Sequence, residues 1–84
     1  MEKRIGTALI LIESDENIAL FNQIVFNHSH IVIGRQGIPV RERNYNIISL
    51  VLEGNTDEIG SLTGQLGRLS GLHVKSVLLP VLSR

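Results

Sequence analysis

Residues 31–54, IVIGRQGIPVRERNYNIISLVLEG, decide the fold of this chain. One strand-like run begins at Ile31 and continues to Pro39, and a second covers Tyr45–Leu52. Only the short polar connection Arg41–Asn44 separates the two runs, which indicates an antiparallel β-hairpin. Proline cannot donate to a β-ladder, so the strand that contains Pro39 is expected at an edge of its sheet.

The sequence before the hairpin predicts a strand followed by a helix. Arg4–Ile12 is rich in Ile, Leu and Thr, which favours a strand. The segment Ser14–Asn17 supplies a side-chain cap and acidic residues for the first turn of a helix. Apolar residues then recur with helical spacing up to His28, and they form one face: Ile18, Phe21, Ile24 and Val25.

The sequence after the hairpin predicts a second helix and a fourth strand. Asn55 or Thr56 provides the N-cap, and two acidic residues follow in the first turn, where the helix dipole favours them. The helix is expected to end at Ser70-Gly71, with the glycine in a left-handed conformation. His73–Val81 is the last predicted strand. The apolar stripe of the helix consists of Ile59, Leu62, Leu66 and Leu69.

The resulting order, βαββαβ, predicts an α+β fold of the ferredoxin-like or ACT-like class. In this plait a four-stranded antiparallel sheet carries both helices on one face, and right-handed crossovers give the strand order 4-1-3-2. The strand with Pro39 then lies at an edge, as the proline requires. No repeat or linker interrupts residues 1–84, so we expect a single ACT-like domain.

Composition narrows the range of functions. Cysteine is absent, which excludes disulfides, thiolate metal sites and cysteine nucleophiles. Eight basic residues balance eight acidic ones, and no basic run exceeds Lys3-Arg4, so we expect no direct binding of nucleic acid. The longest apolar run, Ala8–Ile12, is far too short to span a membrane, and the first residues lack the pattern of a signal peptide. We therefore expect a cytoplasmic protein that has no membrane partner.

The predicted strands are apolar on both faces, whereas an isolated plait exposes one face of its sheet to water. Successive residues of a strand point to opposite faces, and both are apolar here: Leu9 and Ile10 in the first strand, and Val51 and Leu52 in the third. A chain of this length buries only about 60–65% of its unfolded surface, so its own core gives marginal stability. We expect another copy to cover the second face in a homo-oligomer, a dimer or tetramer; the alternative is an unusually apolar monomer.

The second helix also carries a face of glycines, at Gly60, Gly64 and Gly67, with Gly71 next in the same spacing. Each internal glycine costs about 1 kcal/mol relative to alanine, so a close approach of another backbone is expected to offset this cost. The approaching surface is either the first helix or the sheet of the same subunit, or a helix of a neighbouring subunit.

Two histidines are the candidate metal ligands. His28 and His30 form an H-x-H pair, and imidazole binds nickel, zinc or copper. The third histidine, His73, lies in a distant strand, and no thiolate supports the pair. Solvated histidines at a helix end are the simpler interpretation, so we predict no metal site and keep metal binding by this pair at a subunit interface as the alternative function.

Three arginines are the candidates for binding an effector or partner. Arg35, Arg41 and Arg43 lie on and beyond the edge strand, where guanidinium groups could hold an anion or a carboxylate. The alternative is a solvated turn of mixed charge. The chain has no nucleophile elbow and no glycine-rich phosphate loop, so we do not expect an enzyme, and no cofactor is identified.

Four segments carry a resemblance to a known family: Arg35–Glu42, Ile47–Gly54, Thr56–Gly67 and Val74–Ser76. They resemble the small regulators that accompany the iron-only hydrogenase maturation system in anaerobic bacteria, which are ACT-like domains. The resemblance covers nearly the whole chain. It implies a ferredoxin-like oligomer with a regulatory role in hydrogenase expression or maturation, and it does not identify an effector. Our own hypothesis is that the interfaces of the oligomer hold a small-molecule effector.

The fold is also similar to the C-terminal domain of the nickel-responsive ribbon-helix-helix repressors. That resemblance places Ile38, Val40 and Asn46 near the positions of the nickel ligands, so the ligands themselves are missing. Asn46 joins the arginines as a candidate for effector binding. Amino-acid-binding ACT domains carry a glycine after the first strand, where this chain has Glu13–Glu16, and this departure argues against amino-acid sensing.

Overall fold

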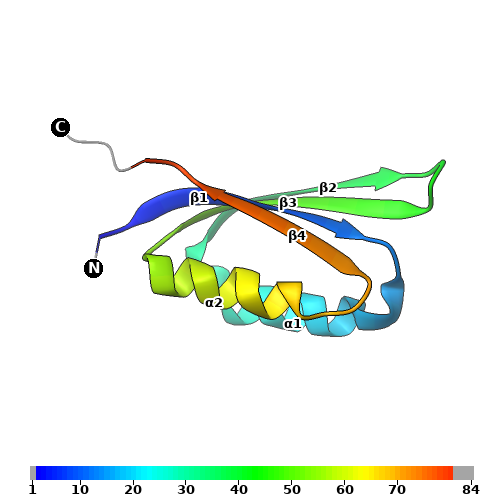
Figure 1. The fold of residues 1–84 in the computed structure, drawn as a ribbon, viewed down its shortest axis with the longest axis horizontal. Coiled ribbons are helices and arrows are strands. Elements are labelled where there is room, and N and C mark those ends of the chain that lie inside the picture. Colours follow the sequence, from blue (N-terminus) through cyan, green and yellow to red (C-terminus); the bar gives the residue numbers. More distant parts are fainter. Residues whose placement is uncertain (1, 81–84) are drawn as a thin grey trace.

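The computed structural model describes residues 2–80. Within them, a twisted four-stranded antiparallel sheet carries both helices on one face (Figure 1). Two short 3₁₀ turns, η1 and η2, flank the first helix. The elements in chain order are β1 (Arg4–Ile12), η1 (Asp15–Asn17), α1 (Ile18–Asn27), η2 (Ser29–Ile31), β2 (Val32–Val40), β3 (Tyr45–Gly54), α2 (Thr56–Gly67) and β4 (Leu72–Leu78).

The strands lie in the order β2-β3-β1-β4, which is the predicted order 4-1-3-2 counted from the opposite edge. The predicted α+β plait is therefore confirmed. β2 lies at one edge, as Pro39 requires, and pairs with β3 in the predicted hairpin. In the turn Arg41–Asn44, Asn44 adopts the left-handed conformation that asparagine tolerates, with φ of 61°.

The core lies between the sheet and the helices because side chains alternate along each strand. On β1, Ala8, Ile10 and Ile12 are buried, whereas Ile5 and Leu9 point to the other face and are exposed. Both helices contribute their predicted apolar faces. The buried hydrophobic residues are Ala8, Ile10, Ile12, Phe21, Val25, Ile31, Leu50, Leu52, Ile59, Leu62, Leu66 and Leu72.

A capping box starts α2. The Asn55 side chain accepts a hydrogen bond from the Glu58 backbone N–H at 2.8 Å, and the Glu58 carboxylate accepts one from the Asn55 backbone N–H at 2.9 Å. Of the two predicted caps, Asn55 is the one used. These bonds satisfy backbone donors that a helix start otherwise leaves open.

Several element ends differ from the prediction. α2 ends at Gly67, before the predicted Ser70-Gly71, because the chain turns earlier toward β4. Gly71 does have the expected left-handed conformation, with φ of 83°, but within that turn. β4 ends at Leu78, and Val81, the predicted last strand residue, lies outside the described residues. Neither helix among residues 2–80 has the length and hydropathy to cross a membrane.

Gly6 is required where β1 and β4 approach each other. A Cβ at this position would lie 2.7 Å from Leu78 Cδ2 and 2.8 Å from the Val77 carbonyl oxygen. Since backbone must shift to relieve this overlap, a Gly6→Ala variant is expected to lose about 1–3 kcal/mol of stability. Its Tm, followed by circular dichroism, should fall by roughly 4–8 °C per kcal/mol. Gly37→Ala is the control, because a Cβ there meets nothing within 4 Å; equal Tm values for the two variants would contradict the prediction.

Glu58 makes the start of α2 sensitive to pH. Its pKa is lowered, chiefly because the Asn55 backbone N–H donates to its carboxylate and to a smaller degree by His30. Because the pKa of Glu58 is lower in the folded chain than in the unfolded chain, its carboxylate stabilises the fold fully above the unfolded value of about 4.3. This stabilisation is lost as the pH falls through the pKa of the folded chain. Glu58→Gln keeps an acceptor for Asn55, so its Tm should fall less than that of the native chain between about pH 5 and pH 3. Parallel Tm profiles for the two proteins would show that Glu58 does not make this contribution.

Candidate functional site

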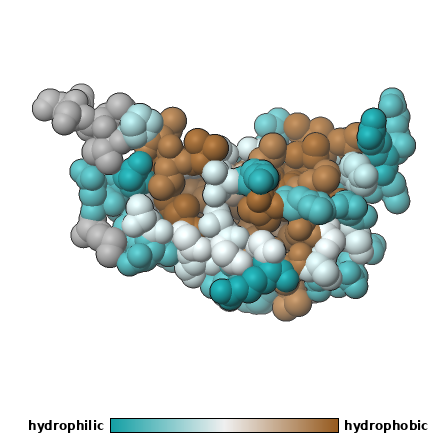
Figure 2. Space-filling view, in the orientation of Figure 1, coloured by the Kyte–Doolittle hydropathy of each residue, from teal (hydrophilic) through white to brown (hydrophobic). Residues whose placement is uncertain are grey.

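The face of the sheet opposite the helices is mostly apolar, as predicted, and is exposed, with Lys75 directly across from Leu9. Leu9 at its centre is 52% exposed, and Val77 on β4 is 63% exposed. Figure 2 shows hydrophobic residues gathered over the strands, above a paler surface over α2. We call this surface the open sheet face. Its register places on it mostly apolar or small residues: Ile5, Thr7, Leu9, Leu11, Gly34, Ile38, Val40, Tyr45, Ile47, Ser49, Val51 and Val77. It also carries four polar or charged residues: Gln36, Glu53, His73 and Lys75.

A shallow hollow of about 180 Å³ lies at one end of the open sheet face, where β1, β3 and β4 meet. Thr7 is its polar side chain, and its hydroxyl donates a hydrogen bond to the Leu50 carbonyl oxygen at 2.9 Å. This hydroxyl is already satisfied, so the hollow suits an apolar group from a partner. Its lining consists of Ile5, Gly6, Thr7, Val51, Val77 and Leu79.

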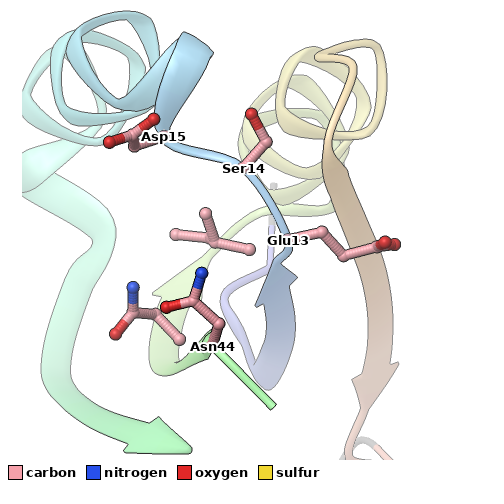
Figure 3. A pocket seen from close by; sticks show the side chains of 6 residues that line it. Glu13, Ser14, Asp15 and Asn44 are labelled. Carbon is pink, nitrogen blue, oxygen red and sulfur yellow. The ribbon is translucent and has the colours of Figure 1, made fainter. Parts of the chain in front are cut away.

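A second, polar pocket of about 180 Å³ lies at the other end of β1. It forms where the β1–η1 connection meets the tip of the β2–β3 hairpin, and its lining residues are Ile12, Glu13, Ser14, Asp15, Asn44 and Asn46. Figure 3 shows Asp15 and Asn44 reaching this region from the two separate segments, while the Glu13 side chain points away toward β4. There the Glu13 carboxylate contacts His73 Nε2.

The connection that borders the polar pocket is fixed to the turn between α2 and β4. The Glu13 backbone N–H donates to the Gly71 carbonyl oxygen at 2.8 Å, and Asn17 Nδ2 donates to the Ser70 carbonyl oxygen at 2.9 Å. The Ser70 hydroxyl donates to the Glu16 carboxylate at 2.9 Å. The pocket wall is therefore preformed in the isolated chain.

The four candidate effector-binding residues lie in two separate regions of the structure. Asn46 lines the polar pocket, and Arg41 and Arg43 are exposed in the same hairpin turn as Asn44. Arg35 lies five strand residues before Val40, about 17 Å from the turn along the extended chain. Its guanidinium carbon sits 5.6 Å from the centre of the Phe21 ring, in a cation–π contact with α1. The structure therefore does not bring Arg35 together with the other two arginines.

The lining residues Glu13, Ser14, Asp15 and Asn44 were not predicted as site residues. They belong to two connections that are distant in the sequence. The signal that could have identified them is the topology, because the pairing of Ile12 with Asn46 brings the end of β1 to the hairpin tip.

His28 connects the two helices. Its Nδ1 lies 2.7 Å from the Ile24 carbonyl oxygen, so Nδ1 carries a proton and donates. In the neutral ring Nε2 is then an acceptor, and the Ser61 hydroxyl of α2 lies 3.1 Å away. Gln65 Nε2 extends the chain of hydrogen bonds by donating to Ser61 at 3.0 Å.

His30 has a different partner. Its Nε2 lies 3.2 Å from Glu58 Oε2, at the start of α2, so the two histidines do not converge on one point. Among residues 2–80, no three His, Asp or Glu side chains gather closely enough to hold a metal ion.

The glycine face of α2 is exposed. A Cβ on Gly60, Gly64 or Gly67 would meet no atom within 4 Å. The prediction that the first helix or the sheet of the same subunit packs there is therefore wrong, because the core side of α2 is its Leu62 and Leu66 flank. A neighbouring subunit at this face stays a prediction.

Comparison with solved structures finds a relative that matches most of the chain. The uncharacterized protein TM1266 from Thermotoga maritima is 40% identical, with a TM-score of 0.88, and the match covers 94% of this chain and all of that protein. An unknown protein from Galdieria sulphuraria has a TM-score of 0.64 at 13% identity, which shows the fold alone. The match covers 98% of this chain and 48% of that protein. No curated protein matches the chain.

Comparison with protein families gives a match to the TM1266-like family over residues 4–76. This range includes β1, β2, β3, both helices and β4 as far as Ser76. The family resemblance expected from the sequence is thus confirmed, and the chain belongs to the TM1266-like family of proposed iron-only hydrogenase system regulators.

Proposed function

We propose that the chain is a non-enzymatic regulatory module that works as a homo-oligomer in the cytoplasm, in the expression or maturation of the iron-only hydrogenase system. Its family supports the regulatory role. The observation that carries the oligomer is the open sheet face, whose central residue Leu9 is half exposed although it lies on an interior strand. Apolar surface of this kind marks a protein interface.

Large apolar side chains of the open sheet face lack cover within the subunit. Leu9, Ile38 and Val77 are each at least half exposed. We expect the partner to be a second copy of the chain. The small core gives marginal stability, so the open sheet face needs a partner that is always present, and another copy of the same chain always is.

A small effector would bind near the polar pocket. Asn44 and Asn46 supply amide donors and acceptors there, and Asp15 supplies a carboxylate. Arg41 and Arg43 belong to the adjacent turn, so they remain the proposed anion-binding groups. The balanced charge of the chain supports regulation through protein or small-molecule contacts, without direct binding of nucleic acid.

Leu9→Glu tests the oligomer. A carboxylate at the centre of the open sheet face stays hydrated in a monomer but must be buried in a face-to-face assembly, so the dissociation constant should rise at least about tenfold, or 1.4 kcal/mol. Sedimentation velocity over a concentration series measures this change. Phe26→Glu is the matched control, because Phe26 is 71% exposed on α1, away from the sheet. An unchanged sedimentation profile for Leu9→Glu would remove the open sheet face as an interface.

The alternative function, metal binding through His28 and His30, has less support. The Nε2 lone pair of neutral His28 faces the Ser61 hydroxyl, and His30 faces Glu58. A metal would have to displace both contacts.

His28→Ala separates a structural role from a metal site. The variant loses the bonds to Ile24 and Ser61, so it should be less stable by about 1–2 kcal/mol in metal-free buffer. Nickel or zinc should leave the Tm of the native chain unchanged, since only a metal bound to the folded state raises it. A metal-dependent rise in Tm that disappears in His28→Ala would establish the alternative.

A further inference from the structure

The two edges of the sheet differ in how they are protected. At the β2 edge, Pro39 lacks a backbone donor, and the register with β3 shifts between Val32 and Gly34. Proline and irregular register are two features that prevent an edge strand from pairing with another chain. β4, at the other edge, pairs with β1 in unbroken register from Leu72 to Leu78 and contains no proline, and its one lysine, Lys75, lies on the open sheet face across from Leu9. The β4 edge is therefore the one suited to pairing.

The backbone of β4 leaves a row of donors and acceptors facing outward. The Leu79 N–H donates to the Ile5 carbonyl oxygen at 2.8 Å, so Leu79 points its backbone groups toward β1. In an antiparallel ladder these directions alternate, which turns the backbone groups of Val74, Ser76 and Leu78 away from the sheet. Such a row is a template for one more strand.

The flank of α2 beside this edge is free of bulky side chains. α2 packs against β4, and its opposite flank faces α1 through the Ser61 contact with His28. In Figure 2 the surface over α2 is pale, in contrast to the hydrophobic surface over the strands. Helical spacing of i, i+4, i+7 and i+11 places on the flank away from α1 only small residues: Thr56, Gly60, Thr63 and Gly67.

This combination identifies the incoming strand. A strand added to β4 lies about 4.8 Å from it, and if it is the β4 of a second copy it brings that copy's α2 with it. Because α2 lies beneath β4 and β1, the two α2 axes would then be about 10 Å apart, which is the separation of packed helices. Small residues on that flank let the helices reach this distance. A peptide that adds only a strand to β4 brings no helix to the flank of α2. Such a partner would not explain why that flank has glycines.

We propose that β4 is a pairing edge: two copies join antiparallel, β4 to β4, into one eight-stranded sheet with the two α2 helices side by side. The two copies are related by a two-fold axis, so each uses its β4 edge and the contact forms a dimer that cannot extend further. The inference concerns a different surface from the open sheet face, although it rests on the same proposal that the chain is a homo-oligomer. Both contacts together would make a tetramer, since edge pairing leaves the open sheet face uncovered.

Gly60→Arg tests the inference. Arginine has a better helix propensity than glycine, so the variant should keep its helix content by circular dichroism. At the proposed contact it blocks the approach of the second α2, and the dissociation constant measured by sedimentation velocity should rise at least tenfold. Ala19→Arg is the matched control, because it adds the same side chain to an exposed small residue of α1. An unchanged dissociation constant for Gly60→Arg would overturn the inference.

Ser76→Pro tests the edge itself. It removes one outward N–H without removing a bond between β4 and β1, so the fold should persist while association weakens as it does in Gly60→Arg. A folded Ser76→Pro variant with native association would also overturn edge pairing. If this variant unfolds, Gly60→Arg decides alone.

Leu9→Glu distinguishes this inference from the proposed function. If both contacts exist, Leu9→Glu and Gly60→Arg each give a particle half the native mass, and the double variant sediments as the 9.3 kDa chain. If only the open sheet face associates, Leu9→Glu alone gives the monomer and Gly60→Arg changes nothing. If only the β4 edge associates, Gly60→Arg alone gives the monomer and Leu9→Glu changes nothing. A native chain that sediments at 9.3 kDa would overturn both.

Discussion

Burial of one face of the sheet against two helices is the interaction on which the rest of the structure depends. It gathers the buried residues of β1, β3, α1 and α2 into one apolar layer. The two helices among residues 2–80 cover one face of the four-stranded sheet and leave the other exposed. The exposed Leu9 on an interior strand is the direct result of this arrangement.

Around this layer, polar side chains hold the elements in place at their ends. His28 and Ser61 join the two helices, Asn55 and Glu58 start α2, and Asn17 joins the first turn to Ser70. These contacts lie at or near the surface and leave the core without a buried polar residue among residues 2–80. Among the ionisable side chains, Glu16, His28 and Glu58 make such links, whereas Arg41 and Arg43 are exposed in the hairpin turn.

The sequence predicted the fold well because its signals were local. The proline in the hairpin, the alternating strands and the apolar helix faces each depend on neighbouring residues, and the structure confirms all three. The candidate site was harder to predict, since it depends on distance between segments. Arg35 and Arg41 are near each other in the sequence but are separated by an extended strand, whereas Asp15 and Asn44 are far apart in the sequence and line one pocket. Of the two surfaces expected to pack on the glycines of α2, the one within the subunit is wrong, because the position of these glycines on the helix turns them outward.

The pairing of β1 with β4 has a consequence for how the chain acquires its fold. Arg4 Nη2 donates to the Leu79 carbonyl oxygen, a contact between residues 75 positions apart. A nascent chain makes β1 first, yet this strand receives its second neighbour only when β4 has left the ribosome, since translation proceeds from the N-terminus. During most of synthesis β1 therefore has at least one open side. Closing the sheet requires the longest loop in the domain, which slows folding relative to a helical protein of equal length.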